Sequence, residues 1–141
     1  MKKLLSIPLF FVAFALPLYL FEMRYRVQFD ELELNSGGIY RDAPFFYLPI
    51  SVLLALVVGW ASTRFTRKKI FRLIVIFVYI LFYMWMCFFI ADESKQLLGF
   101  TWSNTEILTE LIFSKWYFYV FGSTGLATFI FLNIHHSGKK Q

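Results

Sequence analysis

The sequence predicts an all-α membrane protein, a four-transmembrane-helix antiparallel bundle with both termini in the cytoplasm. Three observations lead to this fold class. The 141 residues are 59% hydrophobic and only 16% charged, whereas a soluble domain carries about a quarter charged residues. Four long runs contain no charged residue at all. The segments between these runs alternate between basic and acidic along the chain.

Aromatic content narrows the class of protein further. Nineteen Phe, eight Tyr and four Trp exceed what the core of so short a chain can hide, because small domains leave much of their surface in water. Soluble, disordered and fibrous proteins are therefore excluded. The single cysteine, Cys87, excludes an intramolecular disulfide, a CxxC redox pair and a cysteine-built zinc site.

The four charge-free runs mark the predicted spans, and each is between 18 and 21 residues long. About 20 helical residues are needed to cross a hydrocarbon core of about 30 Å. Backbone polar groups must be satisfied internally in lipid, so we expect each run to be a helix. The predicted spans are residues 4–21, 43–63, 73–91 and 116–134.

The first span also has the features of a cleavable signal peptide. Two lysines follow Met1, an apolar stretch comes next, and Ala13-Phe14-Ala15 resembles a cleavage site. However, the apolar run continues to Phe21, whereas a cleavage site is normally followed by polar chain. We expect the span to be retained, and cleavage would remove one helix without changing the rest of the topology.

The first connection, residues 22–42, is mainly acidic. Val27–Leu34 alternates partly between apolar and polar residues, which predicts a short extended or interfacial segment, and Asn35–Gly38 is a strong turn signal. Arg41 and Asp42 stand directly before the second span. Such a pair is either an exposed site for binding a partner or a cap that anchors the helix.

The second connection is basic, and it sets the predicted orientation. The chain start, this connection and the chain end together hold nine basic and no acidic residues, whereas the other two connections hold nine acidic and five basic residues. Excess Lys and Arg mark cytoplasmic loops. We expect membrane lipids, and no nucleic acid, as partners of this short loop. Its predicted headgroup contacts are Arg64, Arg67, Lys68, Lys69 and Arg72.

The remaining connection, before the last span, predicts a short helix. Ser103 and Glu106 have the spacing of a capping box, and apolar residues follow on one helical face. We expect this helix over residues 104–113, at the outer membrane interface.

The last two spans offer packing surfaces. Small residues let helices approach closely, so Gly122, Ser123 and Gly125 serve either to pack against the chain's own helices or to bind a foreign helix. Aromatic residues crowd the third span and are expected either to face lipid or to stack on a partner. They are Phe77, Tyr79, Phe82, Tyr83, Trp85, Phe88 and Phe89.

The sequence argues against transport and catalysis. No charged residue falls within a predicted span, whereas ion-coupled carriers and proton relays keep ionisable groups in the bilayer. His135 and His136 follow the last span, and nearly all acidic residues are predicted on the other side of the membrane. We therefore expect no enzyme, no metal site and no cofactor.

At the level of the whole chain, this layout resembles the immunity proteins of pore-forming colicins, particularly the A-type group. The similar features are four spans with both ends inside, a long first outer loop, a basic second loop, a terminal lysine pair, and the stretch Ile39–Pro44 leading into the second span. The resemblance implies a bacterial inner-membrane protein that binds the toxin's pore-forming domain within the bilayer and blocks channel opening. The predicted partner-binding residues are then Arg41, Asp42, Gly122, Ser123 and Gly125.

A second interpretation comes from another class. The aromatic spans would equally suit a small accessory subunit of an envelope secretion, pilus or conjugation complex, and exclusion of phage or plasmids is a third. A homo-oligomer or a hetero-complex is compatible with all of these.

Overall fold

The computed structural model describes residues 6–30, 43–65, 69–98 and 103–138, and all of the secondary structure in these ranges is helical. Four long helices are α1 (Ser6–Asp30), α2 (Ala43–Phe65), α3 (Lys69–Leu98) and α5 (Trp116–Gly138). A short helix α4 (Asn104–Glu106) and a π-helix η2 (Ile107–Phe113) lie between α3 and α5. The all-α class predicted from the sequence is therefore confirmed for this part of the chain.

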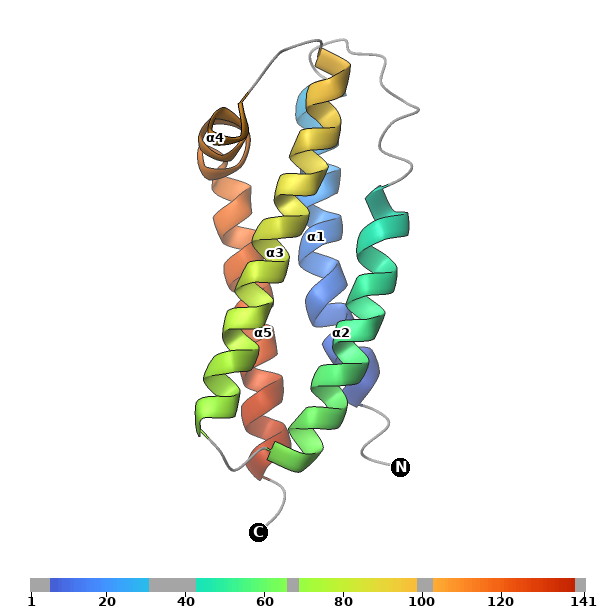
Figure 1. The fold of residues 1–141 in the computed structure, drawn as a ribbon, viewed down its shortest axis with the longest axis vertical. Helices are drawn as coiled ribbons and strands as arrows, with labels where there is room; N and C mark the ends of the chain where they lie inside the picture. Colours follow the sequence, from blue (N-terminus) through green and yellow to red (C-terminus); the bar gives the residue numbers. More distant parts are fainter. Residues whose placement is uncertain (1–5, 31–42, 66–68, 99–102, 139–141) are drawn as a thin grey trace.

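The long helices run alternately up and down along one axis (Figure 1). Helix α1 packs most extensively against α2 and α5, while α3 lies across α1 and α5. The ends of α1 and α3 lie at the same end of the bundle as α4 and η2, which we call the upper end (Figure 1). Long helices that follow one another along the chain are thus antiparallel, whereas α1 and α3 run in the same direction (Figure 1).

Helix α1 is longer than the sequence predicted. It continues through Glu22 to Asp30, so the placement of Glu22 in a loop and the extended segment expected from Val27 are wrong for these residues. The reason is local: Glu22 and Arg26 are four residues apart and form an ion pair along the helix, a spacing that favours helix.

Two helices are long and apolar enough to cross a membrane. Judged by length and composition, the candidate spans are Ile7–Val27 in α1 and Ile70–Asp92 in α3. Helices α2 and α5 contain the shorter apolar segments Phe45–Ala61 and Trp116–Leu132. The chain therefore has at least two candidate membrane spans among the described residues.

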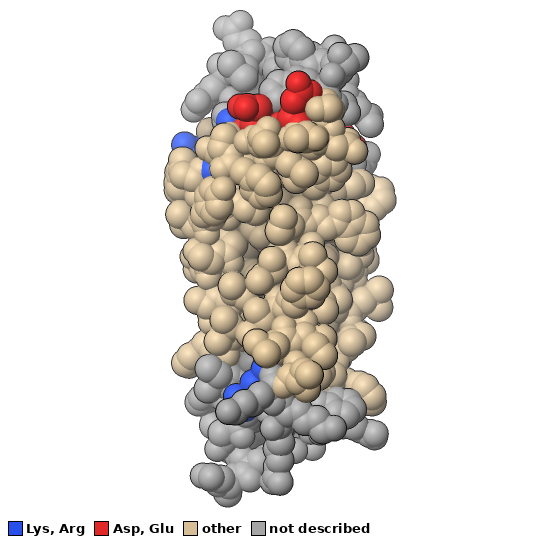
Figure 2. All heavy atoms as spheres, turned by 60° about the vertical axis from the view of Figure 1, so that its left-hand side comes forward, with Lys and Arg blue, Asp and Glu red and all other residues tan. Residues whose placement is uncertain are grey.

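The outside of the bundle is strongly apolar on all four long helices. In the view of Figure 2, a broad band without charged residues separates the upper end, where acidic and basic side chains appear, from basic side chains at the opposite end. Soluble monomers rarely expose apolar patches larger than a few hundred Å². The large apolar side chains with the greatest exposure include Phe45, Leu53, Phe77, Trp85, Trp116 and Phe131.

The core of the bundle is aromatic. The ring of Phe14 lies 5.5 Å from that of Tyr79, 5.6 Å from Phe82 and 5.3 Å from Phe129, measured between centroids. Tyr83 is also buried. For Tyr79, Phe82 and Tyr83, the expectation that they face lipid is wrong, because these side chains point into the bundle and pack between α1, α3 and α5.

Helices α4 and η2 lie to one side of the bundle near its upper end (Figure 1), and they span the residues where the sequence predicted a short helix. The capping box is present: the backbone N–H of Ser103 donates to Glu106 Oε2 at 2.7 Å, and the backbone N–H of Glu106 donates to Ser103 Oγ at 3.3 Å. Beyond it the chain forms a π-helix and buries Ile107, Leu111 and Ile112. This apolar face holds the segment on the bundle.

We expect the stability of the capped helix α4 to depend on pH through the carboxylate of Glu106. The backbone N–H of Ser103, and then the Ser103 hydroxyl, hydrogen-bond to this carboxylate and lower its pKa below the ordinary value of 4.5. A carboxyl group whose pKa is lowered by folding stabilises the folded state at pH values above its ordinary pKa. This contribution is lost as the pH falls through the lowered pKa. The protection factors of the amides across η2, which correct the exchange rates for their intrinsic dependence on pH, should therefore fall on acidification. Glu106→Gln should abolish this pH dependence, and an equally pH-dependent Glu106→Gln protein would contradict the assignment.

Candidate functional site

An open groove runs along the surface between α3 and α5, with a volume of about 430 Å³. It is almost wholly apolar, and it includes two of the residues that the sequence predicted to bind a partner, Gly122 and Ser123. Its lining is Tyr79, Ile80, Tyr83, Met84, Phe118, Tyr119, Val120, Gly122, Ser123 and Leu126. We call this the α3–α5 groove.

Two glycines on α5 lie in close contact with two tyrosines on α3. A Cβ atom added at Gly122 would lie 2.6 Å from Cε1 of Tyr83. One added at Gly125 would overlap the hydroxyl of Tyr79 and the ring of Pro17 on α1. Of the two roles left open for these glycines, the structure shows packing against the chain's own helices.

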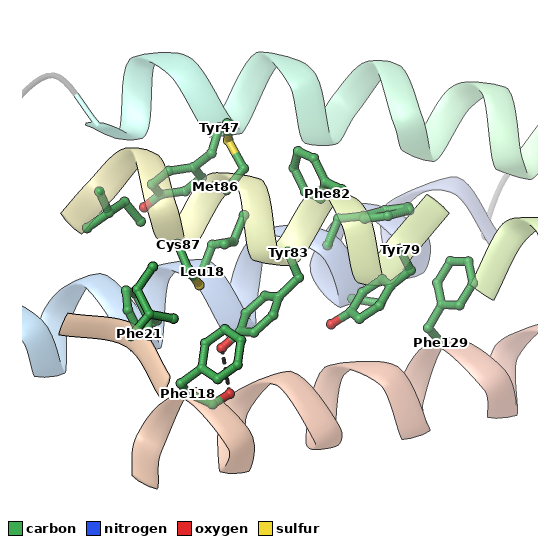
Figure 3. Close-up of a cluster of buried hydrophobic side chains, with 14 of the residues drawn as sticks. Leu18, Phe21, Tyr47, Tyr79, Phe82, Tyr83, Met86, Cys87, Phe118 and Phe129 are labelled. Atoms are coloured by element: carbon green, nitrogen blue, oxygen red, sulfur yellow. Dashed lines mark hydrogen bonds between the residues drawn. The ribbon is translucent and has the colours of Figure 1, made fainter. Parts of the chain in front are cut away.

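The two tyrosines lie side by side and reach from α3 toward α5 (Figure 3). Their rings are parallel within 2°, with centroids 6.4 Å apart. The Tyr83 hydroxyl donates to the backbone carbonyl of Phe118 at 3.0 Å. The Tyr79 hydroxyl is buried without a hydrogen-bond partner in the part of the chain that the structure describes. Tyr83 therefore fixes one wall of the groove, whereas Tyr79 is held by ring packing.

Ser123 is exposed and lies on the rim of the α3–α5 groove. Its hydroxyl donates to the backbone carbonyl of Val120 at 3.1 Å. Thr124 and Thr128 bond back to their own helix in the same way. A hydroxyl that donates one hydrogen bond still has lone pairs that can accept another. Ser123 can therefore accept a hydrogen bond from a neighbouring helix while its donor stays satisfied.

Gly125 borders a second, smaller groove on the other side of α5, against α1. This groove is lined by Val12, Ala13, Leu16, Pro17, Leu20, Phe121, Thr124, Gly125 and Thr128. Gly125 itself is buried. Three small residues of the last span were predicted to bind a partner, and Ser123 is the one of these that is exposed on the outside of the bundle.

The other predicted site residues are only partly described. Arg41 and Asp42 lie outside the described residues, as do Arg67 and Lys68 of the predicted headgroup contacts. Arg64 is in the last turn of α2 and Lys69 begins α3, with side chains outside the described part. Arg72 is partly buried in the first turn of α3. Their predicted contacts with lipid headgroups stay a prediction.

A buried polar cluster was missed by the sequence reasoning. Glu22, 2% exposed, accepts hydrogen bonds from Tyr47 on α2 at 2.7 Å and from Arg26 at 2.6 Å. The i,i+4 spacing of Glu22 and Arg26 could have indicated that the helix continues past residue 21. The partnership with Tyr47 has no local sequence signal, because it joins residues that are 25 positions apart.

No group of three or more His, Cys, Asp or Glu residues that could hold a metal ion is found among the described residues. The grooves hold no ionisable side chain except the tyrosine phenols, so their chemistry is that of packing and hydrogen bonding. The chain matches no known protein family, and no characterised protein or solved structure is significantly similar to it.

Proposed function

We propose that the chain is embedded in the bacterial inner membrane through four spans, with both termini in the cytoplasm. Helices α2 and α5 have 23 residues each, which at 1.5 Å per residue is about 35 Å and enough to cross the hydrocarbon core. The exposed apolar band on all four helices supports this placement. The excess of basic residues at the chain start, second connection and chain end supports the orientation.

Within this setting, we propose that the protein is an immunity protein that binds the pore-forming domain of a bacteriocin and keeps its channel closed. The observation that carries the proposal is the α3–α5 groove, because it offers an apolar helix a shallow seat beside a small residue, Ser123. The partner is proposed from the resemblance to colicin immunity proteins.

Recognition in lipid needs many contacts. A hydrogen bond between membrane helices contributes about 0.6–2 kcal/mol, and lipid provides no hydrophobic driving force for association. A single acceptor such as Ser123 therefore cannot hold a partner alone. Shape complementarity along the groove, from Ile80 to Leu126, would supply most of the affinity.

The experiment that tests the function is a challenge of sensitive bacteria. Cells expressing the chain are exposed to a broad panel of pore-forming bacteriocins, and membrane depolarisation and survival are measured. We expect protection against at least one toxin and none against a bacteriocin that acts as a nuclease. No protection against any member of the panel would contradict the proposal. Stable, stoichiometric partners recovered from unchallenged cells would favour the accessory-subunit interpretation.

Blocking the α3–α5 groove should weaken protection. We expect Ser123→Trp to lower the protective effect by about tenfold or more, since a bulky ring on the rim prevents close helix approach and several contacts of 0.6–2 kcal/mol are lost together. The matched control is Val57→Trp, on the exposed face of α2, which should protect as the unmodified chain does. Both variants are compared at equal amounts in the membrane. Full protection by Ser123→Trp would show that the partner binds elsewhere.

A further inference from the structure

The smaller groove between α1 and α5 follows one face of α1, and we call it the α1–α5 groove. Val12, Leu16 and Leu20 line it at intervals of four residues, a spacing that places side chains on the same face of a helix. All three side chains are exposed. This wall of the groove therefore lies on the outside of the bundle.

The opposite wall of the α1–α5 groove includes Phe121, Thr124 and Thr128 on α5. The two threonine hydroxyls donate to backbone carbonyls of their own helix, at 2.7 Å for Thr124 and 2.9 Å for Thr128. Their hydrogen-bond donors are therefore satisfied without a ligand. Since the rest of the lining is almost wholly apolar, the groove suits a hydrocarbon chain better than a polar group.

A basic residue, Arg24, continues the same face of α1 one turn above Leu20. It is exposed, and it forms no ion pair with any residue that the structure describes. The closest acidic residue along α1 is Glu22, whose two oxygens already accept hydrogen bonds from Tyr47 and Arg26. The guanidinium of Arg24 is therefore available to an anion, and its planar fork matches the geometry of a phosphate.

The depth of Arg24 and the length of the groove both fit one leaflet of a membrane. The ring of Phe21 lies 5.4 Å from that of Tyr117, the second residue of α5, measured between centroids. Arg24 is three residues further along α1, about 4.5 Å higher, and thus level with the start of α5. Charged side chains border the apolar band at this end of the bundle (Figure 2). Below Arg24, residues 12–20 extend over about 12 Å, close to half of a hydrocarbon core of about 30 Å.

We infer that the α1–α5 groove binds an anionic phospholipid from the leaflet that faces away from the cytoplasm. One acyl chain lies in the groove along residues 12–20, and the phosphate pairs with Arg24. Charge selects the headgroup: the ammonium of a zwitterionic lipid competes with Arg24 for the phosphate, whereas phosphatidylglycerol has no such group. The inference rests on the proposed membrane placement and does not depend on the bacteriocin.

The headgroup contact is tested by titrating the purified full chain in detergent with phosphatidylglycerol or phosphatidylethanolamine and measuring the Kd of the first bound lipid by native mass spectrometry. We expect phosphatidylglycerol to bind more tightly, and Arg24→Gln to weaken its binding about fivefold. Arg24→Lys keeps the charge and should weaken binding less. Equal affinity of Arg24→Gln and the unmodified chain would overturn the inference. So would displacement of the lipid by excess inorganic phosphate, which would indicate a site for the free anion.

The position of the acyl chain is tested by filling the groove. Leu16→Trp should weaken the binding of phosphatidylglycerol, whereas the matched control Leu56→Trp, at a similarly exposed position on α2, should bind the lipid as the unmodified chain does. Equal affinities of the two variants would overturn the placement of the chain in the α1–α5 groove. Both titrations measure lipid affinity, so they decide the inference whether or not the chain protects against a bacteriocin.

Discussion

Replacing Gly125 with leucine is expected to destabilise the bundle by about 3 kcal/mol or more, because overpacking a closed core costs about 1–3 kcal/mol even for small insertions. A Cβ at this position already overlaps the Tyr79 hydroxyl and the Pro17 ring. The proline ring is fixed to the backbone of α1 and cannot turn away. The free energy of unfolding, measured in mixed micelles by denaturing-detergent titration, checks this expectation.

Gly125→Ala tests the same contact with a smaller side chain. Alanine improves helix propensity by about 1 kcal/mol, but the overlap with two groups should outweigh this gain. Tyr79→Phe alone should be neutral or stabilising, since it removes a buried hydroxyl without a described hydrogen-bond partner. In the double variant, Tyr79→Phe should recover part of the loss caused by Gly125→Ala. Strictly additive effects would contradict the proposed close approach.

Gly59 is the matched control for these glycine substitutions. A Cβ there would lie 3.1 Å from Cγ1 of Ile7, a partly exposed side chain near the start of α1. A small adjustment of Ile7 relieves this contact, so Gly59→Ala should be nearly neutral. A loss in Gly59→Ala as large as in Gly125→Ala would show that the effect is not specific to the tyrosine contacts.

Phe14→Ala is expected to cost about 2–4 kcal/mol. The side chain is 1% exposed, and it contacts the rings of Tyr79, Phe82 and Phe129. Each aromatic pair contributes about 0.5–1.5 kcal/mol beyond area burial. The apolar transfer term that adds to such losses in water is small in lipid, because an unpacked helix stays in hydrocarbon. The cost therefore comes from lost contacts and from the cavity.

The control for Phe14 is the same substitution at Phe77, which is 61% exposed on α3. Phe77→Ala exchanges contacts with lipid or detergent for similar contacts and should change the unfolding free energy by less than about 0.5 kcal/mol. Both variants are measured by the same detergent titration. Equal losses at the two positions would contradict the packing of α1 against α3 and α5.

Composition and charge were sufficient to predict the helical class and the approximate positions of four helices. Lipid leaves few alternatives for long charge-free runs, so the runs predicted helices directly. The helix ends were harder, because α1 continues through charged residues that the charge-free runs excluded. Glu22 is stable there because Tyr47, far away in the sequence, supplies a hydrogen bond.

The small residues on the last span were recognisable from the sequence, but their neighbours were not. Gly122 and Gly125 could pack against the chain's own helices or a foreign one. The role of each residue depends on which face of α5 is turned toward the bundle. Because α5 is apolar on all sides, its sequence has no polar face that would predict this orientation. The structure resolves this by placing Tyr83 and Tyr79 against the glycines and leaving Ser123 outside.

Reporter fusions test most directly the proposal that four helices cross the inner membrane. Two reporters are fused, in separate proteins, after Gly38, Lys68, Gly99 and Gln141. Alkaline phosphatase is active only outside the cytoplasm. Green fluorescent protein fluoresces in the cytoplasm but not after export through the general secretion route. We expect active phosphatase after Gly38 and Gly99, and fluorescence after Lys68 and Gln141. Fluorescence after Gly38 or Gly99, or active phosphatase after Lys68 or Gln141, would contradict the four-span topology.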